Sequence, residues 1–150
     1  MSYVGIVGVE AAKLTPATEA TAREIIRVLL ADPLAVLVSG ACPLGGIDII
    51  AEEEADALGR EKVIYPPKSN DWYTGFRPRN ERIASKSEIV HCITLGSYDL
   101  FPSGYVGRRW KTTSGDPYCY HCKDRNEPHV KSGGCWTAWR CAAQEWWILQ

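Results

Sequence analysis

The chain has 150 residues, enough for one domain with its own hydrophobic core, and its 45% hydrophobic and 23% charged residues are typical of soluble globular proteins. The formal net charge of −1 gives no strong signal for nucleic-acid binding, although residues 1–59 carry a net charge of −6 and residues 60–150 one of +5. No apolar segment reaches the roughly 20 residues of a membrane span and no signal peptide is recognisable, so we expect a cytoplasmic protein whose six cysteines are thiols or metal ligands.

The first half of the chain alternates between strand and helix patterns. Residues 3–9 (YVGIVGV) are apolar at both odd and even positions, as in a strand buried on both faces. An amphipathic helix follows and ends before Pro33. Residues 35–39 (AVLVS) predict a second buried strand, and residues 46–58 predict a helix that ends at Gly59.

The alternation continues with a strand at 62–66, a loop through Asp71–Pro78, a helix near 79–87 and a strand at 88–94. Because strand–helix alternation implies right-handed crossovers, these elements predict a parallel sheet covered by helices. We therefore expect a single Rossmann-like α/β domain over residues 1–150. It should have three layers, with an open parallel sheet of about five strands and helices on both faces.

Residues 96–131 interrupt this alternation. They are rich in glycine, proline, serine and charged residues, and they contain no long periodic segment. A loop of this length is uncommon inside a compact domain unless it is functional or held in place. Regular structure is predicted to resume with a helix near 134–145 and a last strand at 146–149.

The segment from Ser39 to Asp48 (SGACPLGGID) follows a predicted strand and begins a predicted helix. Open α/β sheets bind ligands at this position, and the free N–H groups of a helix start favour an anion. The segment is not a P-loop, because Gly46 and Ile47 follow Gly45 where lysine and serine or threonine would be needed. A tight turn that uses glycine for its geometry alone is the alternative.

Two later motifs support a ligand site. Arg77, Arg79 and Asn80 lie in RPRNERIA, and arginine suits bidentate contact with phosphate or carboxylate, although a solvated basic turn would look the same. Residues 132–138 (SGGCWTA) repeat the glycine turn at a helix start. Two such turns on one edge of the sheet would hold two parts of a nucleotide-like molecule. Trp136 would either stack on its base or pack in the interior.

Four residues between positions 119 and 135 have the spacing of a metal site. Cys119, Cys122, His129 and Cys135 offer three thiolates and one imidazole, which is enough for a closed tetrahedral structural zinc site. His121 is an alternative to His129, and reduced cysteines without metal are the alternative to the whole site. Zinc at these residues would hold the 96–131 insert against the second glycine turn and fix the backbone of that turn.

Together these motifs resemble the SLOG superfamily. The resemblance rests on VGIVGV, VSGACPLGGIDIIAEEEA, RPRNERIA, EIVHCIT and SGGCWTA, and it covers most of the chain outside 96–131. This Rossmann-like group includes the DNA-processing protein A type, the Lonely Guy phosphoribohydrolases and small stand-alone nucleotide sensors, and the chain is more similar to the last. Its members bind nucleotides or nucleotide-derived molecules, often as dimers, so the resemblance implies such a ligand and a homodimer. The ligand-binding positions it implies are Gly8, Ser39, Gly40, Gly45, Gly46, Asp48, Arg79, Asn80, Ser132, Gly133, Gly134 and Thr137.

One departure from the phosphoribohydrolases bears on catalysis. Their second turn reads Gly-Gly-x-Gly-Thr with a glutamate shortly after it, whereas this chain has Trp136 in place of the third glycine and Trp139 and Arg140 in place of acidic residues. Asp48 and the run 52–54 are the remaining candidates for a catalytic carboxylate. Binding without turnover is favoured. A nucleotide N-glycosidase or phosphoribohydrolase is the alternative, and a zinc-containing interaction domain with purely structural glycine turns is a third interpretation.

Overall fold

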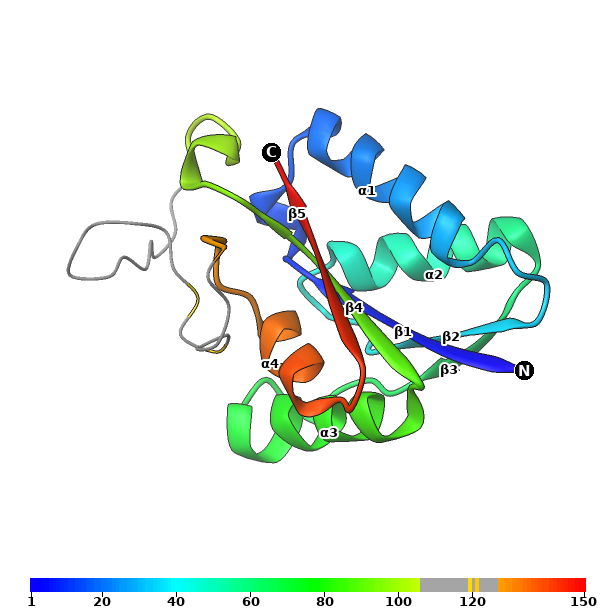
Figure 1. The fold of residues 1–150 in the computed structure, drawn as a ribbon. Coiled ribbons are helices and arrows are strands. Elements are labelled where there is room, and N and C mark those ends of the chain that lie inside the picture. Colours follow the sequence, from blue (N-terminus) through cyan, green and yellow to red (C-terminus); the bar gives the residue numbers. More distant parts are fainter. Residues whose placement is uncertain (106–118, 120, 122–126) are drawn as a thin grey trace.

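The structure is a computed structural model that describes residues 1–105, 119, 121 and 127–150. Five parallel strands form one sheet in the order β3-β2-β1-β4-β5 (Figure 1). The strands are β1 (Ser2–Gly8), β2 (Ala35–Ser39), β3 (Glu61–Ile64), β4 (Ile89–Leu95) and β5 (Gln144–Leu149). The α-helices are α1 (Pro16–Leu29), α2 (Ile47–Leu58), α3 (Arg77–Lys86) and α4 (Gly133–Arg140).

The predicted fold class is confirmed, because helices cover both faces of this parallel sheet (Figure 1). Helices α1 and α2 pack on one face in a cluster that includes Ile6, Leu37 and Ile93. Helices α3 and α4 pack on the other, in a cluster that includes Val7 and Val90. Among the described residues, no helix combines the length and the apolar character that crossing a membrane requires.

The C-terminal helix is shorter than predicted. Helix α4 ends at Arg140 rather than near residue 145, and β5 begins at Gln144 rather than at residue 146. Cys141 has an extended backbone, with φ −81° and ψ 147°, and its buried thiol donates to the Ser87 carbonyl oxygen at 3.7 Å. The chain is then in place to pair with β4 over six residues, and this pairing overrides the helical pattern of residues 141–145.

The segment before α3 is helical rather than a loop. Residues Trp72–Phe76 form one π-helical turn, η2, which leads directly into α3. The Asp71 side chain accepts a hydrogen bond from the Thr74 N–H at 2.9 Å and so begins the turn. Short 3-10 turns also follow β1 (η1, Ala11–Lys13) and β4 (η3, Tyr98–Leu100), the second inside the predicted 96–131 insert.

Two glycines bring α4 against the end of β1. A side chain on Gly134 would place its first carbon 2.5 Å from the Gly8 nitrogen and 2.9 Å from the Gly8 Cα. A side chain on Gly8 would collide with the carbonyl oxygen of Ile93 in the neighbouring strand. Backbone therefore meets backbone here, and the first turn of α4 lies directly against the carboxyl end of β1.

Replacing Gly134 by alanine should lower the free energy of unfolding by about 1–3 kcal/mol, the usual cost of forcing extra carbon into a packed site. Gly133→Ala is the matched control, because no described atom lies within 4 Å of its added carbon and it should change stability little. Urea denaturation followed by circular dichroism measures both variants. Equal losses of stability in the two variants would contradict the close contact.

Candidate ligand cleft and metal centre

A cavity of about 830 Å³ lies at the carboxyl edge of the sheet, within the size range of small-molecule sites. Its floor is the end of β1 at Val7 and Gly8, and its walls come from the start of α2, from η2 and α3, and from the start of α4. Because α2 and α4 lead from strands on opposite sides of β1, the cavity occupies the point where the sheet order reverses. Open α/β sheets bind their ligands at such a point.

Most of the ligand-binding positions predicted from the sequence line this cavity. They are Gly8, Gly45, Asp48, Arg79, Asn80, Ser132, Gly133, Gly134 and Thr137. Ser39, Gly40 and Gly46 do not. Ser39 is fully buried, and its hydroxyl donates to the Glu52 carboxylate at 3.1 Å. Gly46 has a φ of +89° and lies against the backbone of Val9, so its role is in the turn.

Gly40 acts through Arg79. The Arg79 guanidinium donates through Nη1 to the Gly40 carbonyl oxygen and would collide with any side chain at position 40. The same nitrogen lies 3.7 Å from the Asp48 carboxylate. Arg79 is only 7% exposed, and its Nε makes no hydrogen bond to any described residue. The cavity wall therefore contains a buried guanidinium with one unused donor.

Asp48 is also 7% exposed. Burial raises the pKa of its carboxyl group to about 6, and the opposing effect of Arg79 is the smaller of the two. Asn80 follows Arg79 in the first turn of α3, is 5% exposed and lines the cavity beside these charges. A fold that keeps such groups beside an open space has the character of a functional site.

The second glycine turn exposes backbone to the cavity. The Ser132 hydroxyl accepts a hydrogen bond from the Cys135 N–H at 3.3 Å, so this side chain caps α4. Gly133 is exposed, whereas Gly134 is buried against β1. The Thr137 hydroxyl donates to the Gly133 carbonyl oxygen at 3.3 Å. Gly134 thus permits α4 to pack against β1, and Gly133 leaves the backbone of the turn accessible to a ligand.

Two lysines that sequence reasoning missed lie beside this turn. Lys13, from η1, and Lys131, just before Ser132, both line the cavity. Burial lowers the pKa of Lys13, the Glu10 carboxylate opposes this shift, and the positive charge of Lys131 adds to it. Sequence reasoning missed the pair because 118 positions separate two residues that only the fold brings together, although Lys131 directly precedes the glycine turn.

Aromatic side chains line another part of the cavity. Trp72, Tyr73 and Phe76 come from η2, and Trp136 and Trp139 come from α4. Trp72 and Trp136 meet edge to face with ring centroids 5.1 Å apart. Only Trp136 was a candidate from the sequence. The aromatic residues of η2 were missed because that segment was predicted to be a loop, although Trp72 and Phe76 have helical spacing.

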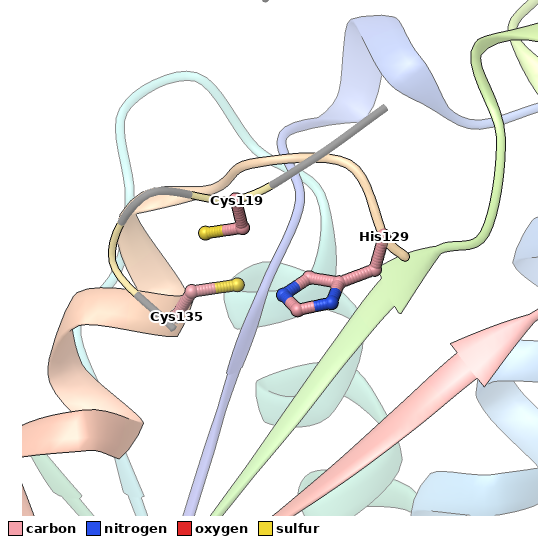
Figure 2. Close-up of side chains that lie close together, drawn as sticks. All are labelled: Cys119, His129 and Cys135. Atoms are coloured by element: carbon pink, nitrogen blue, oxygen red, sulfur yellow. The ribbon is translucent and has the colours of Figure 1, made fainter. Parts of the chain in front are cut away.

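Three of the predicted metal ligands come together beside α4. The side-chain ligand atoms of Cys119, His129 and Cys135 all lie within 4.8 Å of one another, and the three residues are buried (Figure 2). Such a group could hold a metal ion. Cys122 lies outside the described residues, and His121 lines the cavity. Of the two histidines, His129 is therefore the one grouped with the cysteines.

The imidazole of His129 is oriented as in a metal ligand. Its Nδ1 lies 2.9 Å from the Glu127 carbonyl oxygen, to which an Nδ1–H donates, leaving the lone pair on Nε2. Nε2 is buried, makes no hydrogen bond of normal geometry to any described residue, and belongs to the ring edge that faces the two sulfurs in Figure 2. Without a metal, burial lowers the His129 pKa, but interactions with the Cys119 and Cys135 sulfurs outweigh this and raise it to about 10, so a metal would have to displace a proton from Nε2.

The end of β4 holds the histidine segment in place. The Val130 N–H donates to the Leu95 carbonyl oxygen at 2.7 Å, and the Thr94 hydroxyl donates to the Val130 carbonyl oxygen at 2.8 Å. Cys92, in the same strand, lies beneath the cluster with its sulfur 3.7 Å from that of Cys135. The strand thus supports one side of the cluster and α4 supplies the other.

A scan against protein-family models found no match, and searches of curated proteins and of solved structures found none either.

Protein purified without added metal should contain about one metal ion per chain, measured by elemental mass spectrometry. Cys119→Ser should lose it, because serine removes one of the soft sulfur ligands. Cys141→Ser is the control, since Cys141 is also buried, on the same face of the sheet, but lies outside the cluster. A metal-free wild-type protein, or equal metal content in all three proteins, would refute the metal centre.

Proposed function

We propose that this chain binds a nucleotide or a nucleotide-derived molecule in the cavity, as a small stand-alone member of the SLOG group would. The observation that carries the proposal is the composition of the cavity wall. The buried Arg79 guanidinium, the exposed backbone of Gly133 and the Trp72–Trp136 pair all belong to residues that line the same space. A nucleotide has an anionic group, a polar sugar and a flat aromatic base, and each finds a complementary surface there.

The phosphate is best served by the second glycine turn. The start of α4 offers free backbone N–H groups and the positive end of the helix dipole, and Gly133 has no side chain to keep an oxygen away. Lys13 and Lys131 add positive charge on the same side. The base is best served by the aromatic side chains of η2 and α4, since stacking on an aromatic face is worth about 1–3 kcal/mol per base.

The sugar would lie between these two regions. Asp48 can accept hydrogen bonds from hydroxyl groups, and the Asn80 amide can both accept and donate. Arg79, held by Gly40 and Asp48, would present its guanidinium group to the ligand from the cavity wall. The Asp48 carboxylate and the Arg79 guanidinium are both buried, so their polar contacts with the ligand would be made away from water, where such contacts contribute most to binding.

Zinc is the metal that best fits the cluster. Two thiolates and an imidazole suit zinc, and a fourth ligand, Cys122 as predicted from the sequence, would complete a closed tetrahedral site. A closed site is structural. Because Cys135 lies in the first turn of α4, a metal held there would also fix the position of the second glycine turn.

A hydrolase is the second candidate, because Asp48 lines the cavity. A buried carboxylate beside a bound sugar is what cleavage of an N-glycosidic bond needs to stabilise developing positive charge. Glu52, the other acidic candidate, accepts a hydrogen bond from Ser39, which does not line the cavity. Trp136 and Trp139 stand where the hydrolases have glycine and acidic residues, so binding remains the first proposal.

Isothermal titration of the purified protein with AMP, GMP, CMP and UMP tests the proposal. At least one should bind, and Arg79→Lys should weaken binding by about tenfold, because lysine cannot reproduce the guanidinium contacts. Arg82→Lys, an exposed position in the same helix, is the control and should bind as the wild type does.

Circular dichroism first establishes that both variants are folded. Binding by none of the four nucleotides, or equal binding by the two variants, would refute the proposed site. Chromatography of the same mixtures detects the free base and ribose phosphate that a hydrolase would release.

A further inference from the structure

Cys92, in the middle of β4, lies next to the metal cluster without belonging to it. Its sulfur is 3.7 Å from that of Cys135, and both residues are fully buried. The ligand atoms that could hold a metal are those of Cys119, His129 and Cys135, and Cys92 is not among them. Cys135 therefore has two kinds of sulfur neighbour, a fellow metal ligand and a thiol outside the metal group.

Two regular elements of the fold hold these sulfurs beside each other. Cys92 lies in the part of β4 that pairs with β1 on one side and with β5 on the other. Cys135 lies in the first turn of α4, which the contact between Gly8 and Gly134 sets against β1. To form a disulfide, the two sulfurs would have to approach from 3.7 Å to about 2 Å, which is a short movement for two side chains.

The Ser132 side chain lies between this sulfur pair and the main cavity. Its hydroxyl oxygen is 3.4 Å from the Cys135 sulfur and 3.9 Å from the Cys92 sulfur, and Ser132 lines the cavity. The reactivity of a thiol depends on whether its reaction partner can reach it. Both sulfurs are one side chain away from a space that a small polar oxidant such as hydrogen peroxide can enter.

We propose that Cys92 and Cys135 are a site of reversible oxidation, at which a peroxide converts the two thiols into a disulfide and so takes Cys135 away from the metal. The Cys135 thiolate attacks one oxygen of the peroxide and the O–O bond breaks. The other oxygen leaves as hydroxide and takes up a proton to become water, and the sulfur, now two electrons poorer, is a sulfenic acid. The Cys92 thiol then attacks that sulfur. An S–S bond forms, the S–O bond breaks, and the hydroxide leaves with the Cys92 proton as a second water.

The disulfide and the metal compete for the same sulfur. A sulfur bonded to Cys92 no longer offers the thiolate that a metal requires, which leaves Cys119 and His129 among the described ligands. Cys92 also makes the oxidation reversible, because a sulfenic acid that meets no thiol is oxidised further to a sulfinic acid. Cys92 remains available for this step because it lies outside the metal group. The inference goes beyond nucleotide binding and does not depend on it.

Disulfide mapping by mass spectrometry tests the inference on the full chain after treatment with hydrogen peroxide and blocking of the remaining thiols. Trypsin places Cys92, Cys119 and Cys135 in the separate peptides 87–108, 112–123 and 132–140. The expected product joins 87–108 to 132–140 and is reversed by dithiothreitol. The metal content, measured by elemental mass spectrometry, should fall in proportion to the disulfide formed. In Cys92→Ser, Cys135 should end as a sulfinic acid instead.

Cys141→Ser is the matched control and should oxidise as the wild type does, because Cys141 is buried on the same face of the sheet but has its thiol on the Ser87 carbonyl oxygen. Mapping of the wild type needs neither a variant nor a bound metal, so it decides the matter even if Cys92→Ser is unfolded by circular dichroism. A product that joins 112–123 to 132–140, or no disulfide at all, would overturn the site. The same extent of sulfinic acid at Cys135 in the wild type and in Cys92→Ser would also overturn it. Full retention of metal by the disulfide-linked protein would overturn the competition with the metal.

Discussion

The contact between Gly134 and Gly8 determines where the chemistry-bearing residues of this chain lie. It sets the first turn of α4 against the end of β1 without intervening side chains. Gly133 then opens into the main cavity, Cys135 reaches the sulfur–imidazole cluster, and Trp136 packs edge to face against Trp72 in the wall of that cavity. A side chain at position 134 would push α4 away from β1. All three contacts would then be lost together, because Gly133, Cys135 and Trp136 belong to the same turn of the helix.

Burying the charges of Asp48 and Arg79 costs free energy, which apolar packing in another part of the fold offsets. Asp48 and Arg79 are each 7% exposed, and the carboxyl pKa of about 6 indicates that the ion pair does not fully offset desolvation. The large apolar cluster between α1, α2 and the sheet provides the stability that makes such a cleft tolerable. Groups kept in an unfavourable environment beside an open cavity are what the proposed ligand site would require.

The sequence predicted the sheet and most helices because their signals are local. Apolar runs, helical periodicity and terminal glycines define β1, α1, β2 and α2 without reference to the rest of the chain. The end of α4 could not be predicted in this way, because the turn at Cys141 depends on pairing between β4 and β5. Turn η2 was also missed, although its Asp71 cap and the spacing of Trp72 and Phe76 are local signals, and its aromatic residues line the cavity next to α4.

The residues of the candidate site also fall into two groups, those that local sequence patterns indicate and those that only the fold reveals. Cys119, His129 and Cys135 were recognisable because metal ligands have characteristic spacings, and the glycine turns because they stand at strand ends. Lys13 was not, since a lone lysine carries no signal until the fold places it beside Lys131. The sequence likewise could not show that Ser39 lies outside the cavity, because its position depends on a tertiary contact, the hydrogen bond to Glu52.

We propose, as the central claim, that α4 links a metal held by Cys119, His129 and Cys135 to a ligand in the cleft, through Cys135 and Gly133. It is tested most directly by the affinity of the tightest-binding nucleotide before and after a chelator removes the metal, with circular dichroism to show that the sheet stays folded. The account predicts a loss of about tenfold, within the usual range for coupled sites, and recovery when zinc is restored. An unchanged affinity in folded, metal-free protein would contradict it.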